Sequence, residues 1–328
     1  MFKKIVFLAL ALALGGCGSD NDDKPVPVEQ NVSVETGRVV DRDVKSFDVT
    51  DKFGQLTVKS GEFSYASDIK PWSSWWFPSI DRDLFNNDNG QAPLEKYDEY
   101  VLLRHDQAVE AAQFEESRLY NPQQASWAGL CHAWAVASIL HREPSRVVSK
   151  EGMLFSILDQ KALLLKSYEN VSDLEIYGQR YNGLHDNDFH DIYPDQFHRF
   201  MLHYLRDEKK PFIMDYDASY PVWTVPVYIA KTNIVKVDSE TLAVTTWVTY
   251  ASPFVDKHFV GTRQIVKKYT YNLYGEWING SFKVVDSEWT ESSIHDHPDY
   301  VIGFPKTAKR SSYNTELKIN YVDEILKY

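Results

Sequence analysis

The chain has 328 residues, of which 43% are hydrophobic and 14% aromatic, a composition typical of a folded protein with a sizeable core. Its formal net charge is −12, and this acidity argues against nucleic acid as a partner. The sequence contains only two cysteines, Cys17 and Cys131, which call for separate explanations.

The first segment, MFKKIVFLALALALGGC, combines a basic start, a short apolar run and small residues. This pattern predicts an export signal over residues 1–16, because the apolar run is too short to span a membrane permanently. Leu14–Cys17 resembles the lipobox of bacterial lipoproteins, which implies cleavage before Cys17 and a lipid anchor on its sulfur. Gly18 follows, so nothing indicates inner-membrane retention, and we expect a lipid-anchored protein of the cell envelope, at the outer membrane. An ordinary secretory signal with a chance cysteine is the alternative.

Cleavage has consequences for the rest of the chain. Removing residues 1–16 takes away two lysines, so the net charge of the mature chain falls from −12 to −14. Residues 18–35 are polar, acidic and interrupted by proline, which predicts a flexible tether. We therefore divide the chain into a signal (1–16), an anchor with its tether (17–45) and one folded domain (46–328).

Helices are predicted before strands. An alternating stretch between Phe47 and Ser60 favours a strand, and the tryptophan-rich stretch 71–85 is either an aromatic lid on the core or a binding platform. From Pro211 onward the apolar period becomes two, up to the last strand in DYVIGFP. This order predicts an α+β fold with a mainly antiparallel sheet in the second half. The expected helices are Tyr97–Arg118, Cys131–His141, Glu151–Tyr168 and Phe197–Leu205.

Cys131 lies in the string SWAGLCHAWAVASIL and begins a helical run. A thiol in the first turn of a helix feels the positive end of the helix dipole, which favours the reactive thiolate. Gly129 permits a tight turn, and Trp127 and Trp134, which flank the cysteine, are expected to exclude water. The pattern resembles the papain-like enzymes, whose oxyanion-binding glutamine would correspond to Gln124. The alternative is that Cys131 is a small hydrophobe in a core.

A catalytic thiolate needs a base, and His297 is the first candidate because it precedes a late strand in SIHDHPDYVIGF. Asp299 lies on the same face two residues later, which makes it a candidate second carboxylate. Asp286 and Asp217 remain alternatives for that role. His198 is the rival base, although its predicted place on an aromatic helix favours a structural histidine.

The segment HDNDFHD, residues 185–191, is rich in oxygen ligands. Carboxylates at alternating positions, such as Asp186 and Asp188, suit calcium. The segment lacks the glycine and the terminal glutamate of an EF-hand loop. A solvated loop without metal is the alternative.

Five strings in the same order resemble the transglutaminase elicitor family over roughly residues 60–325: WAGLCHAWA, GQRYNG, PDQFH, DYDASYPVWTVPV and HDHPDY. The resemblance implies a papain-like fold and calcium-assisted acyl transfer from a protein glutamine to a primary amine, with Cys131 as nucleophile. Tryptophans such as Trp127 and Trp223 would keep water away from the thioester.

The sequence also departs from the family. Thr224 and Val225 replace the Asn-Gln of the elicitor motif, and Asp286-Ser287 replaces a Gly-Gly pair. Three functions therefore stay open. The first is a protein-glutamine γ-glutamyltransferase, and the second is a papain-like peptidase or glutamine deamidase. The third is a non-catalytic surface lipoprotein whose aromatic residues bind a polymer.

Overall fold

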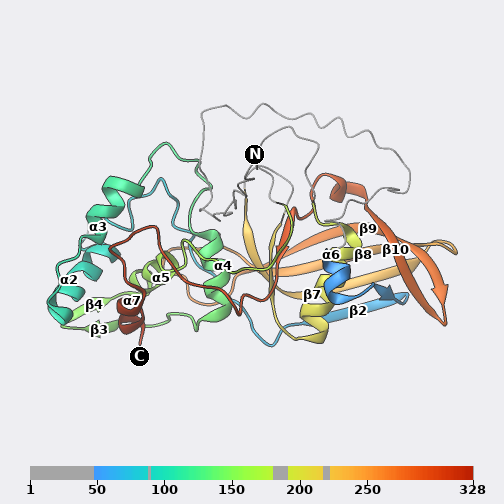
Figure 1. Cartoon of the computed structure of the whole chain (residues 1–328), viewed down its shortest axis with the longest axis horizontal. Coiled ribbons are helices and arrows are strands. Elements are labelled where there is room, and N and C mark those ends of the chain that lie inside the picture. The colour runs from blue at the N-terminus through green and yellow to red at the C-terminus, as the bar shows by residue number, and fades with distance from the viewer. Residues whose placement is uncertain (1–47, 88–89, 180–190, 217–221, 328) are drawn as a thin grey trace, which may run out of the picture.

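The structure is a computed structural model that describes residues 48–87, 90–179, 191–216 and 222–327. A helical lobe and a sheet lobe lie side by side, with helix α4 (Cys131–Leu140) between them (Figure 1). No helix in these four ranges is long and apolar enough to cross a membrane. The α+β class expected from the sequence is confirmed.

The helical lobe is organised around α5, which contacts α2, α4 and α7. A capping box starts α5, because the Ser156 hydroxyl accepts from the Asp159 N–H while the Asp159 carboxylate accepts from the Ser156 N–H. The elements of this lobe are α2 (Pro93–His105), α3 (Ala111–Phe114) with a π-helical turn (Glu115–Leu119), β3 (Val148–Lys150), β4 (Met153–Phe155), α5 (Ile157–Lys166) and α7 (Ile319–Leu326).

The sheet lobe is antiparallel throughout its described pairs, in the order β1-β10-β9-β8-β7-β6-β11-β5, and β2 also pairs with β7. Helices α1 and α6 contact each other beside this sheet (Figure 1). The strands are β1 (Thr57–Val58), β2 (Gly61–Ala66), β5 (Ile176–Gly178), β6 (Phe212–Asp215), β7 (Thr224–Lys236), β8 (Thr241–Ala251), β9 (Gln264–Ile278), β10 (Ser281–Trp289) and β11 (Tyr300–Ile302). The helices are α1 (Asp48–Phe53) and α6 (Pro194–Met201), which continues as a π-helical turn (Leu202–Asp207).

The sheet curls into a half-barrel. Strand β1 pairs with β10 at one side and β2 pairs with β7 at the other, yet only residues 59–60 separate β1 from β2. The curl encloses a second apolar core, distinct from the main one, that includes Leu242, Tyr271 and Phe282. This core gives the sheet lobe stability of its own.

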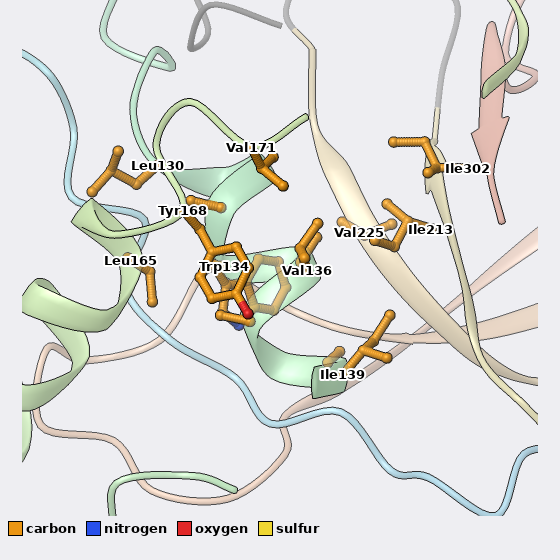
Figure 2. Close-up of a cluster of buried hydrophobic side chains, with 14 of the residues drawn as sticks. Leu130, Trp134, Val136, Ile139, Leu165, Tyr168, Val171, Ile213, Val225 and Ile302 are labelled. Carbon is orange, nitrogen blue, oxygen red and sulfur yellow. The ribbon is translucent and has the colours of Figure 1, made fainter. Parts of the chain in front are cut away.

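Helix α4 is buried on nearly all sides, as expected of a helix that is apolar all round. Figure 2 shows Trp134, Val136 and Ile139 of this helix within the main core. Ile213 and Val225, from β6 and β7, belong to the same core. The sequence predicted the helix correctly but expected one buried face, whereas the two lobes cover it from both sides.

Three expected elements differ from the structure. The expected helix Glu151–Tyr168 is only Ile157–Lys166, because Met153–Phe155 forms β4 and pairs with β3. The stretch 47–60 forms α1 and then only a short strand, because Val49 and Phe53 enter the core as helical side chains. The expected helix 97–118 starts earlier and is divided, because Asp106 adopts a left-handed conformation (φ 52°) that ends α2.

Candidate functional site

The turn before α4 is fixed to the segment that carries Trp76. The Leu130 N–H donates to the Trp76 carbonyl at 2.6 Å, one residue before Cys131. A Cβ atom at Gly129 would lie 2.7 Å from the Phe77 carbonyl oxygen and 2.8 Å from that of Trp76. Only glycine permits this approach of two backbones, so it determines where the sulfur lies.

The Cys131 thiol is fully buried and faces the start of β7, where its Sγ lies 3.8 Å from the Val222 carbonyl oxygen. Trp76, Trp127 and Trp223 pack around it. The structure thus brings Trp127 and Trp223 to Cys131, as predicted. Trp134, also predicted to exclude water, lies instead in the main core, where its indole N–H donates to the Trp72 carbonyl. A substrate can reach the sulfur only when the indole of Trp76, Trp127 or Trp223 moves aside.

Three aromatic side chains from distant segments connect this buried sulfur with solvent, and we call them the aromatic wall: Trp76, Trp223 and Phe254. The rings of Trp76 and Trp223 are 5.4 Å apart, and the Phe254 ring lies 5.6 Å from the first and 4.7 Å from the second. Phe254 is 42% exposed. The wall therefore offers an apolar surface next to the thiol.

A buried ion pair fixes the two segments that carry Trp76 and Phe254. The Lys161 ammonium donates to the Glu143 carboxylate at 2.7 Å and to the carbonyls of Ser73 and Phe259, each at 2.9 Å. Glu143 also accepts from the Gly261 N–H. Burial lowers the pKa of Lys161, and the Glu143 carboxylate opposes this change. The pair clamps both segments to α5.

His297 is held from three sides. Its Nε2 lies 2.9 Å from the Asp191 carboxylate, and its Nδ1 lies 2.8 Å from the Ser293 carbonyl oxygen. Trp289 stacks on the imidazole with ring centroids 5.2 Å apart and an interplanar angle of 16°. Both polar partners accept hydrogen bonds, so the ring donates from both nitrogens when it is an imidazolium.

The sheet places the cysteine and the histidine at the same end. Strand β6 pairs antiparallel with both β7 and β11, so β7 and β11 run parallel and begin at the same edge. Val222, which faces the sulfur, precedes β7, and His297 precedes β11. The two strands are two spacings apart, about 10 Å. The Thr224 and Tyr300 hydroxyls, 3.3 Å apart, link the two strand starts.

The candidates for the third catalytic residue lie in different places. Asp299 is buried beside His297, and its backbone carbonyl accepts from the Ile192 N–H at 3.0 Å. The Asp286 carboxylate accepts from the Ser287 N–H, and Asp217 lies outside the described residues. The carboxylate at hydrogen-bond distance from the imidazole is that of Asp191.

Of the remaining predicted residues, one lies near the cysteine cluster and the other does not. Gln124 is partly buried and accepts from the Asn121 side chain at 3.3 Å, one residue before Ala125, which packs against the cysteine cluster. His198 is fully buried in the sheet lobe, with Nδ1 2.6 Å from the Tyr271 hydroxyl. Burial lowers the pKa of His198 to about 3, which accords with its interpretation as a structural histidine.

The calcium hypothesis rests on Asp186 and Asp188, which both lie outside the described residues. Within the described ranges, no group of three or more acidic, histidine or cysteine side chains forms a metal-binding arrangement. The last carboxylate of that segment, Asp191, contacts His297 instead.

Sequence reasoning missed Asp191 and Trp289 as neighbours of the histidine. Asp191 ends the acidic segment 185–191, and Trp289 follows shortly after the Asp286-Ser287 pair that departs from the family. The backbone hydrogen bond from the Ile192 N–H to the Asp299 carbonyl brings Asp191 close to His297. One feature of the sequence could have indicated Asp191: the residue lies two positions before Tyr193, and α6 begins at Pro194.

Comparisons with known proteins bear on the family and the fold. The family model described as "Transglutaminase elicitor" matches residues 98–259. Among solved structures, the crystal structure of the GP42 transglutaminase from Phytophthora sojae matches with a TM-score of 0.64 and 17% sequence identity, covering 87% of this chain and 97% of that one. No curated protein gives a match. At this identity the structural likeness shows the fold.

Proposed function

Because the chain belongs to the transglutaminase elicitor family, we propose that it is a protein-glutamine γ-glutamyltransferase with Cys131 as nucleophile and His297 as base. One observation carries the proposal: α4, which bears the cysteine, begins at the same sheet edge as the turn that bears the histidine. Asp191 supports the base with its carboxylate.

The first half-reaction forms a thioester. The Cys131 thiolate attacks the carboxamide carbon of a protein glutamine, the C–N bond breaks, and the nitrogen leaves as ammonia after taking a proton from the His297 imidazolium. Since Asp191 holds Nε2, the nitrogen that delivers this proton is Nδ1, which first gives up its bond to the Ser293 carbonyl.

The second half-reaction resolves the thioester. A primary amine, such as a protein lysine, attacks the acyl carbon, His297 accepts the proton of the amine, and an isopeptide bond forms as the Cys131 thiolate is released. The N–H group of Cys131 and the Gln124 side chain are the proposed donors to the oxyanion. Attack by water would instead yield glutamate.

The aromatic wall favours the amine over water. Trp76 and Trp223 cover the sulfur, so a thioester at this position forms in a site with little access for bulk water. The exposed Phe254 extends the apolar surface outward and offers a contact for side chains that flank the reacting glutamine.

The proposed partners are a glutamine-bearing protein, a primary-amine acceptor and, through Cys17, the lipid membrane. We place the protein on the outer membrane of the cell envelope, tethered by residues 17–45. If Cys17 carries the anchor, Cys17→Ala moves the chain from the membrane fraction to the soluble fraction; an unchanged distribution contradicts the anchor.

The test follows incorporation of a fluorescent primary amine into casein, with ammonia release recorded in parallel. Wild type is expected to incorporate the amine, and Cys131→Ala is expected to lose all incorporation. Parallel reactions with calcium and with a chelator decide whether Asp186 and Asp188 serve a metal. Ammonia release without incorporation would indicate a deamidase, and cleaved peptide bonds a peptidase.

A second candidate function follows from the complete burial of Cys131: a polymer-binding lipoprotein without catalysis. It predicts that iodoacetamide labels the thiol only after denaturation and that Cys131→Ala binds the polymer as wild type does. Labelling of the native thiol together with amine incorporation contradicts this alternative.

A further inference from the structure

The half-barrel contains a cavity that the proposed reaction does not use. Its volume is about 280 Å³, and residues from β1, β2, α6, the π-helical turn after α6, β7 and β10 line it. Ile234, which lines it from β7, stands twelve residues beyond Val222 at the cysteine, about 40 Å along the strand. The cavity is therefore separate from the candidate catalytic site.

Part of the cavity wall is apolar, beside polar lining residues such as Thr57 and Ser281. Leu202 and Ile234 are buried side chains of the second core, and Phe63 and Tyr65 pack against that core. The two aromatic rings are nearly parallel, 6.3 Å apart. Ligand pockets usually measure roughly 300–1,000 Å³, so this cavity suits a small molecule with an apolar body and is too small for a long lipid.

A buried polar chain ends at the cavity. The Thr232 hydroxyl lies 3.2 Å from that of Thr246, which lies 2.9 Å from the Tyr271 hydroxyl, and the latter lies 2.6 Å from His198 Nδ1. A phenol is the better donor and imidazole nitrogen the better acceptor, so Tyr271 donates to Nδ1 and the proton of the neutral ring sits on Nε2.

His198 thus presents one unused donor. The residue is 1% exposed and lines the cavity, and Nε2 has no hydrogen-bond partner among the described residues. An N–H group at the cavity lining without a protein partner can donate to an oxygen atom of a ligand. Burial holds the pKa of His198 near 3, so the ring reaches a ligand in its neutral form.

Two cationic side chains line the cavity although the chain is acidic. Lys59 and Arg206 line it, both are exposed, and the lining includes no carboxylate. Arg206 also pairs with Asp207 on its own helix, at 2.6 Å and 3.1 Å. Two cationic side chains, an N–H donor and neighbouring apolar side chains together suit an anion with an apolar body.

We propose that this cavity binds a small monocarboxylic acid with an apolar body: the carboxylate contacts Lys59, Arg206 and the His198 N–H, and the apolar part lies among Phe63, Tyr65, Leu202 and Ile234. The site is non-covalent and independent of Cys131. A test of this site therefore does not depend on whether the proposed acyl transfer is correct.

Binding of 3-phenylpropionate to the purified chain, measured by calorimetry and by saturation-transfer NMR, tests the site. The neutral isostere 3-phenylpropanamide is expected to bind at least tenfold more weakly. Lys59→Gln and Arg206→Gln are each expected to weaken binding of the acid several-fold. Lys309→Gln, an equal change of charge on an exposed lysine of the other lobe, leaves binding unchanged.

Ser281→Trp adds a bulky ring at the cavity lining and is expected to abolish binding. Circular dichroism verifies that this variant folds; should it fail to fold, the two exposed cation variants still decide the question. Absence of binding by the acid overturns the proposal, as does equal binding of acid and amide or an affinity that neither cation variant changes.

Discussion

His297 receives its geometry from residues that its own sequence neighbourhood does not supply. Asp191, the carboxylate partner, is 106 positions away, and Trp289 stacks on the ring from the end of β10. In the proposed reaction the imidazolium forms beside Asp191, so the negative charge stabilises it at the moment of proton transfer. We therefore propose Asp191 for the orienting role, for which the sequence had favoured Asp299.

Asp191→Asn is expected to lower kcat by roughly 10²–10⁴-fold, because an amide keeps the hydrogen bond but loses the charge that stabilises the imidazolium. Steady-state amine incorporation measures the effect. Asp256→Asn, at an exposed position, is the control and should keep wild-type kcat. If Asp191→Asn retains more than half of the activity while Asp299→Asn loses it, the assignment of the partner is wrong.

His198 predicts a pH dependence of stability with a definite sign. Burial, with the nearby Arg206 charge adding to it, lowers its pKa from 6.5 to about 3 in the folded chain, so the unfolded chain binds the extra proton between these values. Stability is then fully present above pH 6.5 and is lost as the pH falls, by about 3 kcal/mol at pH 4. Urea denaturation from pH 4 to 7.5 measures it.

The comparison for this prediction is His198→Asn, whose stability should fall less steeply toward pH 4 than that of wild type. His258→Asn, at an exposed histidine, should follow the wild-type curve. Identical acid dependence of wild type and His198→Asn would contradict a neutral buried imidazole.

At the scale of elements, the turn before α4 positions the nucleophile. Gly129→Ala brings a Cβ against two carbonyl oxygens and should cost about 1–3 kcal/mol of stability, with a marked loss of kcat because the Cys131 turn is displaced. Gly152→Ala has open space but a left-handed φ of +83°, and should cost a similar 1–2 kcal/mol without loss of kcat. Denaturation and amine incorporation are measured on both; equal activity of the two variants would refute this positioning role.

The elements also show what local pattern reveals. Helix α4 was predicted because its apolar residues recur at three- and four-residue spacing, and the strands from Phe212 onward because their side chains alternate. The prediction of a strand over residues 47–60 was wrong because it used only the local alternation of side chains. In the structure, Phe53 packs against Phe200 and His203, which belong to α6 and its continuation. Contacts between residues so far apart in the sequence cannot be predicted from the pattern of a single segment.

At the scale of the whole molecule, the candidate site depends on sheet order. The sequence indicated Cys131 and His297 through their local motifs, Trp127 through its proximity to the cysteine, and Trp223 through the family resemblance. Asp191 was not predictable as a partner, since its approach requires β5, β11 and the chain at Ile192 to meet. A Cβ at Gly178 would lie 2.3 Å from the Asp299 carbonyl oxygen, so this meeting also requires a glycine.

Both lobes contribute residues to the candidate site. Lys161, in the helical lobe, clamps the segments that carry Trp76 and Phe254, and Trp223 completes the aromatic wall from the sheet lobe. Removing one member of a buried ion pair commonly costs 3–5 kcal/mol, so we regard this clamp as a structural requirement of the wall.

The central claim is that Cys131 carries the acyl group, and intact mass spectrometry after mixing the chain with a glutamine peptide, without any amine, tests it most directly. We expect an adduct equal to the peptide less ammonia, mapped to Cys131, which disappears when a primary amine is added. Cys131→Ala should show no adduct and no ammonia release. Ammonia release or amine incorporation by Cys131→Ala at the wild-type rate would contradict the claim, as would a wild-type chain that incorporates amine but carries its acyl adduct on another residue.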